Sequence, residues 1–168
     1  MEKILVTGGA GNIGSSLVKA LLKRKSSSVY VFDSLLTGKK ENLPFKNSNL
    51  IFKECNINNI TELESAWEDN IFDFVFHYAA LVGVSRTQLN PLAVLNDVDG
   101  IKNILKMSSA TGTKRIFFSS SSEVYGEPVE IPQNEDTTPL NSRIPYAIVK
   151  NIGEAFFKAY QKENGLDY

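Results

Sequence analysis

The chain has 168 residues, 42% of them hydrophobic and 22% charged, which is the composition of one ordinary globular domain. Its formal net charge of -1 gives no electrostatic reason to expect nucleic acid or an anionic membrane as a partner. No apolar run approaches the length of a membrane span, and the first predicted strand begins too near Met1 to leave room for a signal peptide. Because Cys55 is the only cysteine, no disulfide can form within the chain, and we expect a reducing, cytoplasmic location.

A turn rich in glycine joins the first predicted strand, residues 3–6, to a helix over residues 13–22. The turn fits two motifs at once: G-x-G-x-x-G with Gly9, Gly11 and Gly14, and G-x-x-G-x-x-G with Gly8, Gly11 and Gly14. Glycine permits a tight turn and close approach of a ligand to the backbone. Amides at the N-terminus of the helix then attract a diphosphate. The turn therefore predicts a dinucleotide site.

A second apolar run, residues 28–32, ends at Asp33. This acid follows the turn by about twenty residues, the offset of a ribose-binding carboxylate. A carboxylate there accepts hydrogen bonds from ribose hydroxyls and repels a 2′-phosphate. We therefore predict NAD rather than NADP as cofactor, the alternative being a structural turn that binds no ligand.

Strands and helices alternate along the rest of the chain. We expect strands over residues 49–53, 72–78 and 114–118, and helices over residues 60–69, 91–112 and 145–164. Trp67 is expected to anchor the core, and Gly100 to mark close packing of its helix. This alternation predicts an α/β fold in which helices cover both faces of a doubly wound parallel sheet.

His77, the only histidine, lies in the aromatic strand over residues 72–78. A histidine can act as an acid or base at neutral pH, but a single one inside such a strand is more often a hydrogen-bonded core residue.

The segment over residues 124–142 contains three prolines and is expected to form a loop with a functional or lid role. No metal site is predicted.

Tyr146 and Lys150 stand four residues apart on the last predicted helix, so their side chains share one face. A phenol with a pKa of about 10 is a poor base at neutral pH. A neighbouring ammonium and a positively charged nicotinamide both favour the phenolate. Tyr146 could then remove a hydroxyl proton while hydride leaves the same carbon, with a serine from the end of the fifth strand bonded to the same oxygen.

These motifs together resemble the extended short-chain dehydrogenases/reductases, specifically the nucleotide-sugar epimerase/dehydratase group. The similarity covers essentially the whole chain and is carried by residues 7–14, Asp33 with Thr37 and Gly38, residues 77–80, 87–91, 120–126 and 145–150. It implies an NAD-binding Rossmann domain over residues 1–168, with strand order 3-2-1-4-5 and a three-layer αβα arrangement.

The resemblance also implies the roles of individual residues. Ser121, Tyr146 and Lys150 would form the catalytic triad. The implied cofactor contacts are Gly8, Gly11, Asn12, Ile13, Gly14, Asp33, Asn56, Ile57, Ala79, Ala80, Leu81, Tyr146 and Lys150. Two positions depart from the family pattern, since Asn56 replaces an Asp that contacts adenine and Asp97 replaces an Asn.

Glu123 bears on the type of reaction. Its place in the Ser-Ser-Glu-Val-Tyr-Gly run is similar to that of the base in 4,6-dehydratases and UDP-glucuronate decarboxylases, whereas 4-epimerases usually carry a small or neutral residue there. In a dehydratase this Glu takes the proton from C5. The alternative is that Glu123 only bonds loop backbone. Ser122 stands where some dehydratases have an Asp acid.

Members of this family continue beyond such a chain with a smaller domain that binds the nucleotide-sugar, so we expect that part to be lacking here. The implied function is an NAD-dependent nucleotide-sugar epimerase or dehydratase, an isomerase or lyase, that forms a transient 4-keto sugar. The alternatives are a cofactor-binding module without turnover and a reductase of non-sugar substrates. The resemblance further implies a homodimer formed by the helix after Pro91 and the Tyr146 helix.

Overall fold

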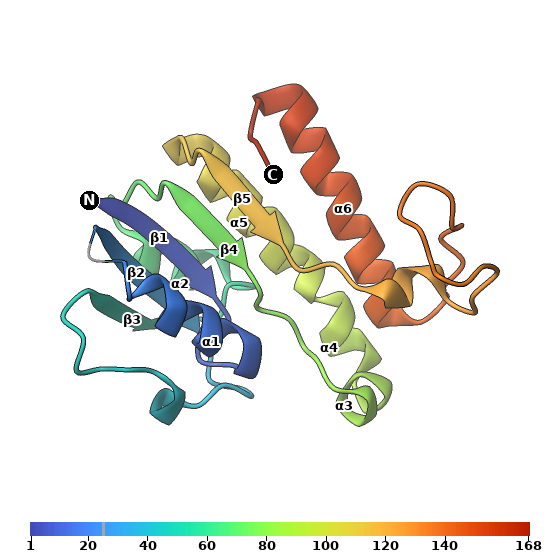
Figure 1. Ribbon diagram of the computed structural model, residues 1–168, viewed down its shortest axis with the longest axis horizontal. Coiled ribbons are helices and arrows are strands. Elements are labelled where there is room, and N and C mark those ends of the chain that lie inside the picture. The colour runs from blue at the N-terminus through green and yellow to red at the C-terminus, as the bar shows by residue number, and fades with distance from the viewer. Residues whose placement is uncertain (25) are drawn as a thin grey trace.

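Five parallel strands form the centre of the molecule in the order β3-β2-β1-β4-β5 (Figure 1). This computed structural model describes residues 1–24 and 26–168. The strands are β1 (Glu2–Thr7), β2 (Ser27–Asp33), β3 (Leu50–Glu54), β4 (Phe74–His77) and β5 (Arg115–Phe118). The strand order confirms the predicted Rossmann-type sheet.

Six α-helices of the described chain surround the sheet. They are α1 (Asn12–Leu21), α2 (Ile60–Trp67), α3 (Val84–Leu89), α4 (Pro91–Leu95), α5 (Asp97–Thr111) and α6 (Pro145–Asn164), with 3₁₀ turns at η1 (Lys40–Asn42) and η2 (Ser122–Tyr125). Both long helices end at a glycine in the left-handed region, Gly112 with φ 77° and Gly165 with φ 70°. None of the helices in the described residues is both long and apolar enough to cross a membrane.

The single helix expected over residues 91–112 is instead divided at Asn96 into α4 and α5. The amide of Asp99 donates to the carbonyl of Asn96 at 3.0 Å, so the chain tightens by an i+3 bond at this point. The carboxylate of Asp97 is meanwhile bonded to groups outside the helix. This break, and the short helix α3 before it, were not expected from the sequence.

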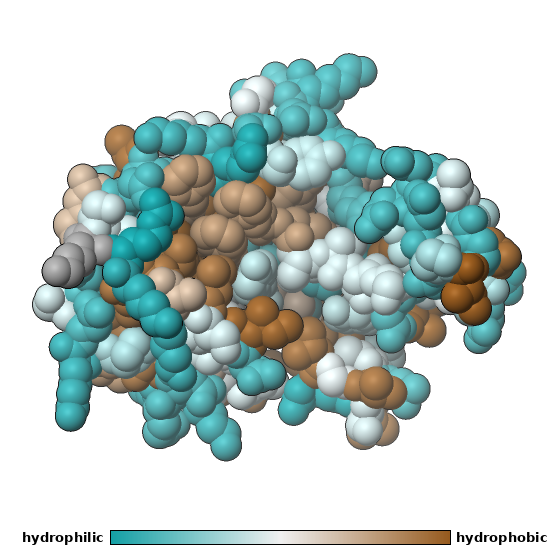
Figure 2. Space-filling view, in the orientation of Figure 1, coloured by the Kyte–Doolittle hydropathy of each residue, from teal (hydrophilic) through white to brown (hydrophobic). Residues whose placement is uncertain are grey.

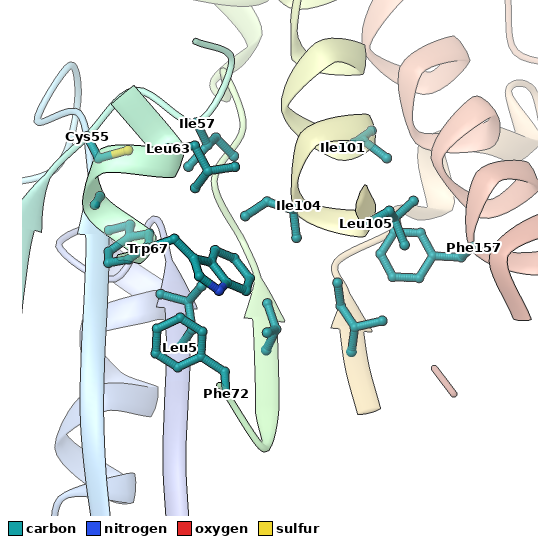
Figure 3. Close-up of a cluster of buried hydrophobic side chains, with 14 of the residues drawn as sticks. Leu5, Cys55, Ile57, Leu63, Trp67, Phe72, Ile101, Ile104, Leu105 and Phe157 are labelled. Carbon is teal, nitrogen blue, oxygen red and sulfur yellow. The ribbon is translucent and has the colours of Figure 1, made fainter. Parts of the chain in front are cut away.

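One face of the sheet packs against α2, α5 and α6 through the larger hydrophobic core (Figure 3). Trp67 is fully buried, as expected, and its ring meets that of Phe72 edge to face at 4.9 Å between centroids. From the opposite end of the core Phe157 of α6 packs onto Phe118, with ring centroids 4.8 Å apart. This core fixes α6, and with it Tyr146 and Lys150, against β5.

On the opposite face, α1 packs on β1 and β2. Phe74 and Phe76 of β4 and Phe117 of β5 stay half-buried on this side, and the rings of Phe76 and Phe117 stack 4.5 Å apart. Figure 2 shows apolar side chains gathered on this face, in front of the sheet in Figure 1. Among the described residues, then, helices cover both faces over β1 and β2 but only one face over β4 and β5.

Candidate functional site

A cleft of about 920 Å³ opens where the carboxyl ends of the strands meet, the edge at which open parallel sheets bind ligands. All thirteen residues implied as cofactor contacts line it: Gly8, Gly11, Asn12, Ile13, Gly14, Asp33, Asn56, Ile57, Ala79, Ala80, Leu81, Tyr146 and Lys150. The structure thus brings together residues from the end of β2, from the segments that follow β1, β3 and β4, and from the first two turns of α6.

The glycines of the first turn are required by close backbone contacts. Gly8 has φ 69°, and a Cβ there would lie 2.8 Å from the amide nitrogen of Ala79. A Cβ on Gly14 would lie 2.3 Å from the carbonyl oxygen of Gly8. Gly9 instead faces the side chain of Val31, 2.7 Å from where its Cβ would lie, and does not line the cleft. Of the two motifs, the one with Gly8, Gly11 and Gly14 therefore describes the cleft.

The N-terminus of α1 points backbone amides at this turn. Its cap residue is Gly11, which supplies no side-chain hydrogen bond. The first-turn amides of Asn12, Ile13 and Gly14 have no partner within the helix, because the first four N–H groups of any helix lack an i−4 carbonyl. Together with the positive end of the helix dipole, these amides suit a diphosphate.

Asp33 lies at the end of β2 with its carboxylate fixed by two backbone amides. Ala10 donates to Oδ2 at 2.9 Å and Leu35 donates to Oδ1 at 2.8 Å. A Cβ on Gly38 would lie 2.7 Å from Oδ1, so this glycine allows its loop to approach the acid. Each carboxylate oxygen keeps a further lone pair with which it could accept a ribose hydroxyl.

His77 is buried behind the cleft rather than in it. The Thr7 hydroxyl accepts hydrogen bonds from the amides of Tyr78 and Ala79, both at 3.2 Å, which leaves its proton for His77 Nδ1 at 2.9 Å. Burial and the charge of Lys150 lower the pKa of His77 to about 3. The burial and hydrogen bond of His77 agree with the predicted core role.

Tyr146 and Lys150 share one face of α6, as their spacing predicts. The Lys150 Nζ atom lies 5.6 Å from the centre of the Tyr146 ring and 4.9 Å from that of Phe118. It donates to Ser119 Oγ at 3.5 Å. Lys150 is only 4% exposed, and this burial lowers its pKa from 10.5 to about 8, although Asp97 acts in the opposite direction.

The protein's own groups raise the pKa of the Tyr146 phenol, whereas the expected preference for the phenolate also counted the charge of a bound nicotinamide. Burial is the largest cause, and the charges of Glu123 and Asp97 add to it, while a hydrogen bond with Ser121 acts in the opposite sense. Burial of a phenol disfavours its charged form. The protein's own groups thus keep Tyr146 protonated.

Ser121 and Glu123 occupy a different position from the other predicted residues. Ser121 acts on the pKa of Tyr146 but does not line the cleft, and its Oγ accepts the amide of Glu123 at 3.2 Å as the cap of η2. Glu123 is exposed and also lies outside the cleft lining. This bond comes from the backbone amide of Glu123, so the alternative in which the Glu123 side chain bonds loop backbone stays a prediction.

Several polar residues lining the cleft were not predicted as site residues, and two of them are bonded to each other. Asp97 and Asn58 face each other, with the Asn58 amide donating to Asp97 Oδ1 at 3.1 Å. The departure of Asp97 from the family's Asn was the one signal that could have indicated it. In the described residues no group of three or more histidine, cysteine, aspartate or glutamate side chains is arranged to hold a metal ion.

Comparison with known proteins agrees with this geometry. Residues 4–168 match the model of the NAD dependent epimerase/dehydratase family. A UDP-glucose 4-epimerase of Neisseria meningitidis serogroup C is 33% identical over 167 residues, covering 96% of this chain and 49% of the relative. The chain thus spans about half the length of the curated relatives that it matches.

Two solved structures extend the comparison to three dimensions. The UDP-glucose 4-epimerase of Thermus thermophilus, in complex with NAD, superposes with a TM-score of 0.87 at 32% identity over 98% of this chain and 52% of that one. The enzyme of Thermotoga maritima, with UDP-glucose, gives a TM-score of 0.88 at 34% identity with the same coverage. By sequence and by fold, this chain belongs to the NAD-dependent epimerase/dehydratase family.

Proposed function

We propose that this chain is the NAD-binding half of a nucleotide-sugar 4-epimerase that works through a transient 4-keto sugar. The observation that carries the proposal is that Tyr146 and Lys150 line the same cleft as the glycine turn and Asp33. A site for a diphosphate, an acid suited to ribose and a phenol–ammonium pair are therefore continuous. The groups that recognise the nucleotide of the substrate would lie in the half of such enzymes that this chain does not match.

The cleft fits NAD by its donors and its shape. The amides at the start of α1 would hold the diphosphate, and Asp33 would accept from the adenosine ribose. A Cβ at Gly14 would overlap the backbone of this cradle, and one at Gly38 would overlap Asp33. When bound, NAD+ would supply a hydride acceptor for the carbon that carries the reacting hydroxyl.

Ser121 and Tyr146 would act on the reacting sugar hydroxyl and its proton. Ser121 would orient the sugar hydroxyl, and Tyr146 would remove its proton as the hydride leaves. Because the protein alone raises the pKa of Tyr146, the phenolate would depend on positive charge from Lys150 together with the nicotinamide. On return of the hydride to the opposite face of the 4-keto sugar, Tyr146 would give the proton back.

The position of Glu123 favours epimerisation over dehydration. A dehydratase needs a second base close to C5 of the sugar, whereas the side chain of Glu123 is exposed to solvent. The relatives described above are 4-epimerases by name. We therefore propose a UDP-sugar as the substrate class.

Titration calorimetry with NAD+ and NADP+, followed by incubation with UDP-glucose or UDP-galactose, tests the proposal. We expect NAD+ to bind more tightly than NADP+ and the two sugars to interconvert. Tight binding without any product would support the alternative of a cofactor-binding module without turnover. A strong preference for NADPH would support a reductase of non-sugar substrates, and a 4-keto-6-deoxy product would establish a dehydratase.

We further propose a homodimer that packs α4 and α6 against their copies. Leu92 and Leu95 of α4 are 76% and 39% exposed, and Ile148 and Ile152 of α6 are each 37% exposed. Pairing these helices would remove the four side chains from water. Light scattering at micromolar concentration should give twice the chain mass, and a monomer would contradict this part of the proposal.

A further inference from the structure

Asp97, at the first turn of α5, connects two loops that line the cleft. Its Oδ2 accepts the amide of Leu81, in the loop after β4, at 2.6 Å. Its Oδ1 accepts the side-chain amide of Asn58, in the loop after β3, at 3.1 Å. These loops follow different strands, and within the described chain Asp97 is the side chain that bonds both.

The rest of the same helix face supports this connection. Gly100 lies one turn further, and a Cβ there would stand 2.3 Å from Asn58 Oδ1. One turn later again, the Asn103 amide donates to the carbonyls of Ile57 at 3.0 Å and Asn58 at 3.3 Å. Residues three apart share one helix face, so this side of α5 is fitted to the loop after β3.

Asp97 and Lys150 line the same cleft, so the carboxylate also supplies charge toward a buried ammonium. The titratable groups around Lys150 are Asp97 on α5, His77 on β4 and Tyr146 on α6 itself. His77 is neutral, and the pKa of Tyr146 is raised, so neither offsets the charge of Lys150. Burial raises the pKa of Asp97, while its bonds to Leu81 and Asn58 and the charge of Lys150 favour the carboxylate.

We propose that Asp97 is a positioning residue with two separable tasks: its two oxygens hold the loops after β3 and β4 together, and its negative charge stabilises the Lys150 ammonium. The second task is absent when an amide occupies the position, as the family pattern has it. The assignment rests on the proposed function only in giving Lys150 a part in catalysis. An Asn could keep both bonds, because the Asn58 amide can reverse and accept from it.

The variants D97N and D97A separate the two tasks in the chain as it stands. Titration of the Lys150 side chain by NMR should give a midpoint near pH 8 in the wild type, and this midpoint should fall by at least about half a pH unit in both variants. Hydrogen exchange of the Leu81 amide should be unchanged in D97N. It should accelerate about tenfold in D97A, because that amide loses its acceptor.

An unchanged Lys150 midpoint in D97N would overturn the electrostatic task, and unchanged Leu81 exchange in D97A would overturn the loop connection. The control D99N removes an exposed acid in the same first turn of α5 and should alter neither readout. Neither measurement requires NAD. If the wild type fails to bind NAD+, the proposed function fails while the role of Asp97 is still decided.

Discussion

The two ends of the cleft are built in different ways. The end at the glycine turn consists of backbone: the amides at the start of α1, the carbonyl of Gly8, and Asp33 held by two further amides. The end at α6 consists of side chains, with Tyr146, Lys150 and Ser119 brought together from segments distant in the sequence. The first end depends on the space that glycine leaves, and the second depends on burial and charge. Substitutions at the two ends should therefore fail in different ways.

The largest effect is expected from Gly14→Ala. The added Cβ would stand 2.3 Å from the Gly8 carbonyl oxygen, so the start of α1 must shift away from the turn. We expect NAD+ affinity to fall about 100-fold, equal to about 2.7 kcal/mol of binding free energy, as measured by calorimetry. Gly112→Ala is the control, since it strains the left-handed backbone (φ 77°) at the end of α5 but meets no atom within 4 Å and lies outside the cleft, so it should lower stability and leave NAD+ affinity unchanged. Equal losses in both variants would contradict the backbone account.

Lys150→Met should raise the stability of the fold. A buried lysine with a pKa near 8, against 10.5 when exposed, destabilises the fold below pH 8, and this cost disappears as the pH rises to 10.5. We expect the variant to be more stable at pH 7 by about 2 kcal/mol, less than the full pKa difference because Asp97 loses its counter-charge.

Urea unfolding of the wild type and Lys150→Met at several pH values measures this difference. The advantage of the variant should shrink between pH 8 and 10.5, where the unfolded wild type binds more protons than the folded one. A variant less stable than the wild type at pH 7 would mean that packing and the Ser119 bond outweigh the cost of the buried charge.

Asp33→Asn tests the carboxylate at the glycine end. One of its two amide partners, Ala10 or Leu35, would face an NH₂ group in place of an acceptor. We expect about a tenfold loss of NAD+ affinity, or about 1.4 kcal/mol, together with a smaller preference over NADP+. Asp69→Asn, an exposed acid outside the cleft, should leave both affinities unchanged. An unaltered preference in Asp33→Asn would refute the ribose assignment.

The smallest effect is expected from Glu123→Gln at the side-chain end. NAD+ affinity should change less than about twofold, because the side chain is exposed and outside the cleft. The pKa of Tyr146 should fall, since the charge of Glu123 helps to raise it. A difference absorbance titration against wild type at the phenolate band would detect this fall. An unchanged Tyr146 midpoint would show that the charge of Glu123 does not act on Tyr146.

The same contrast explains what the sequence could predict. Contiguous patterns were sufficient for the parallel α/β sheet, for α6 over residues 145–164, and for the glycine turn with Asp33, whereas the strand order came from the family resemblance. The break at Asn96 was not readable, because it accompanies bonds from Asp97 to residues far away in sequence. Nor was the raised pKa of Tyr146, which depends on burial that appears only after α6 packs on the core. Ser121 and Glu123 were placed in the site by resemblance, and they lie outside the cleft lining.

The stacked phenyl rings of Phe76 and Phe117, with Phe74 beside them, have a consequence for handling the molecule in solution. Wetted aromatic surface becomes more costly in salts such as sulfate, which are excluded from protein surfaces. Rising sulfate should therefore drive reversible clustering of folded molecules through this side before it affects the interior. The half of the sheet behind α1 would take no part. Because sulfate also strengthens burial in the interior, solubility should fall with rising sulfate while thermal resistance increases.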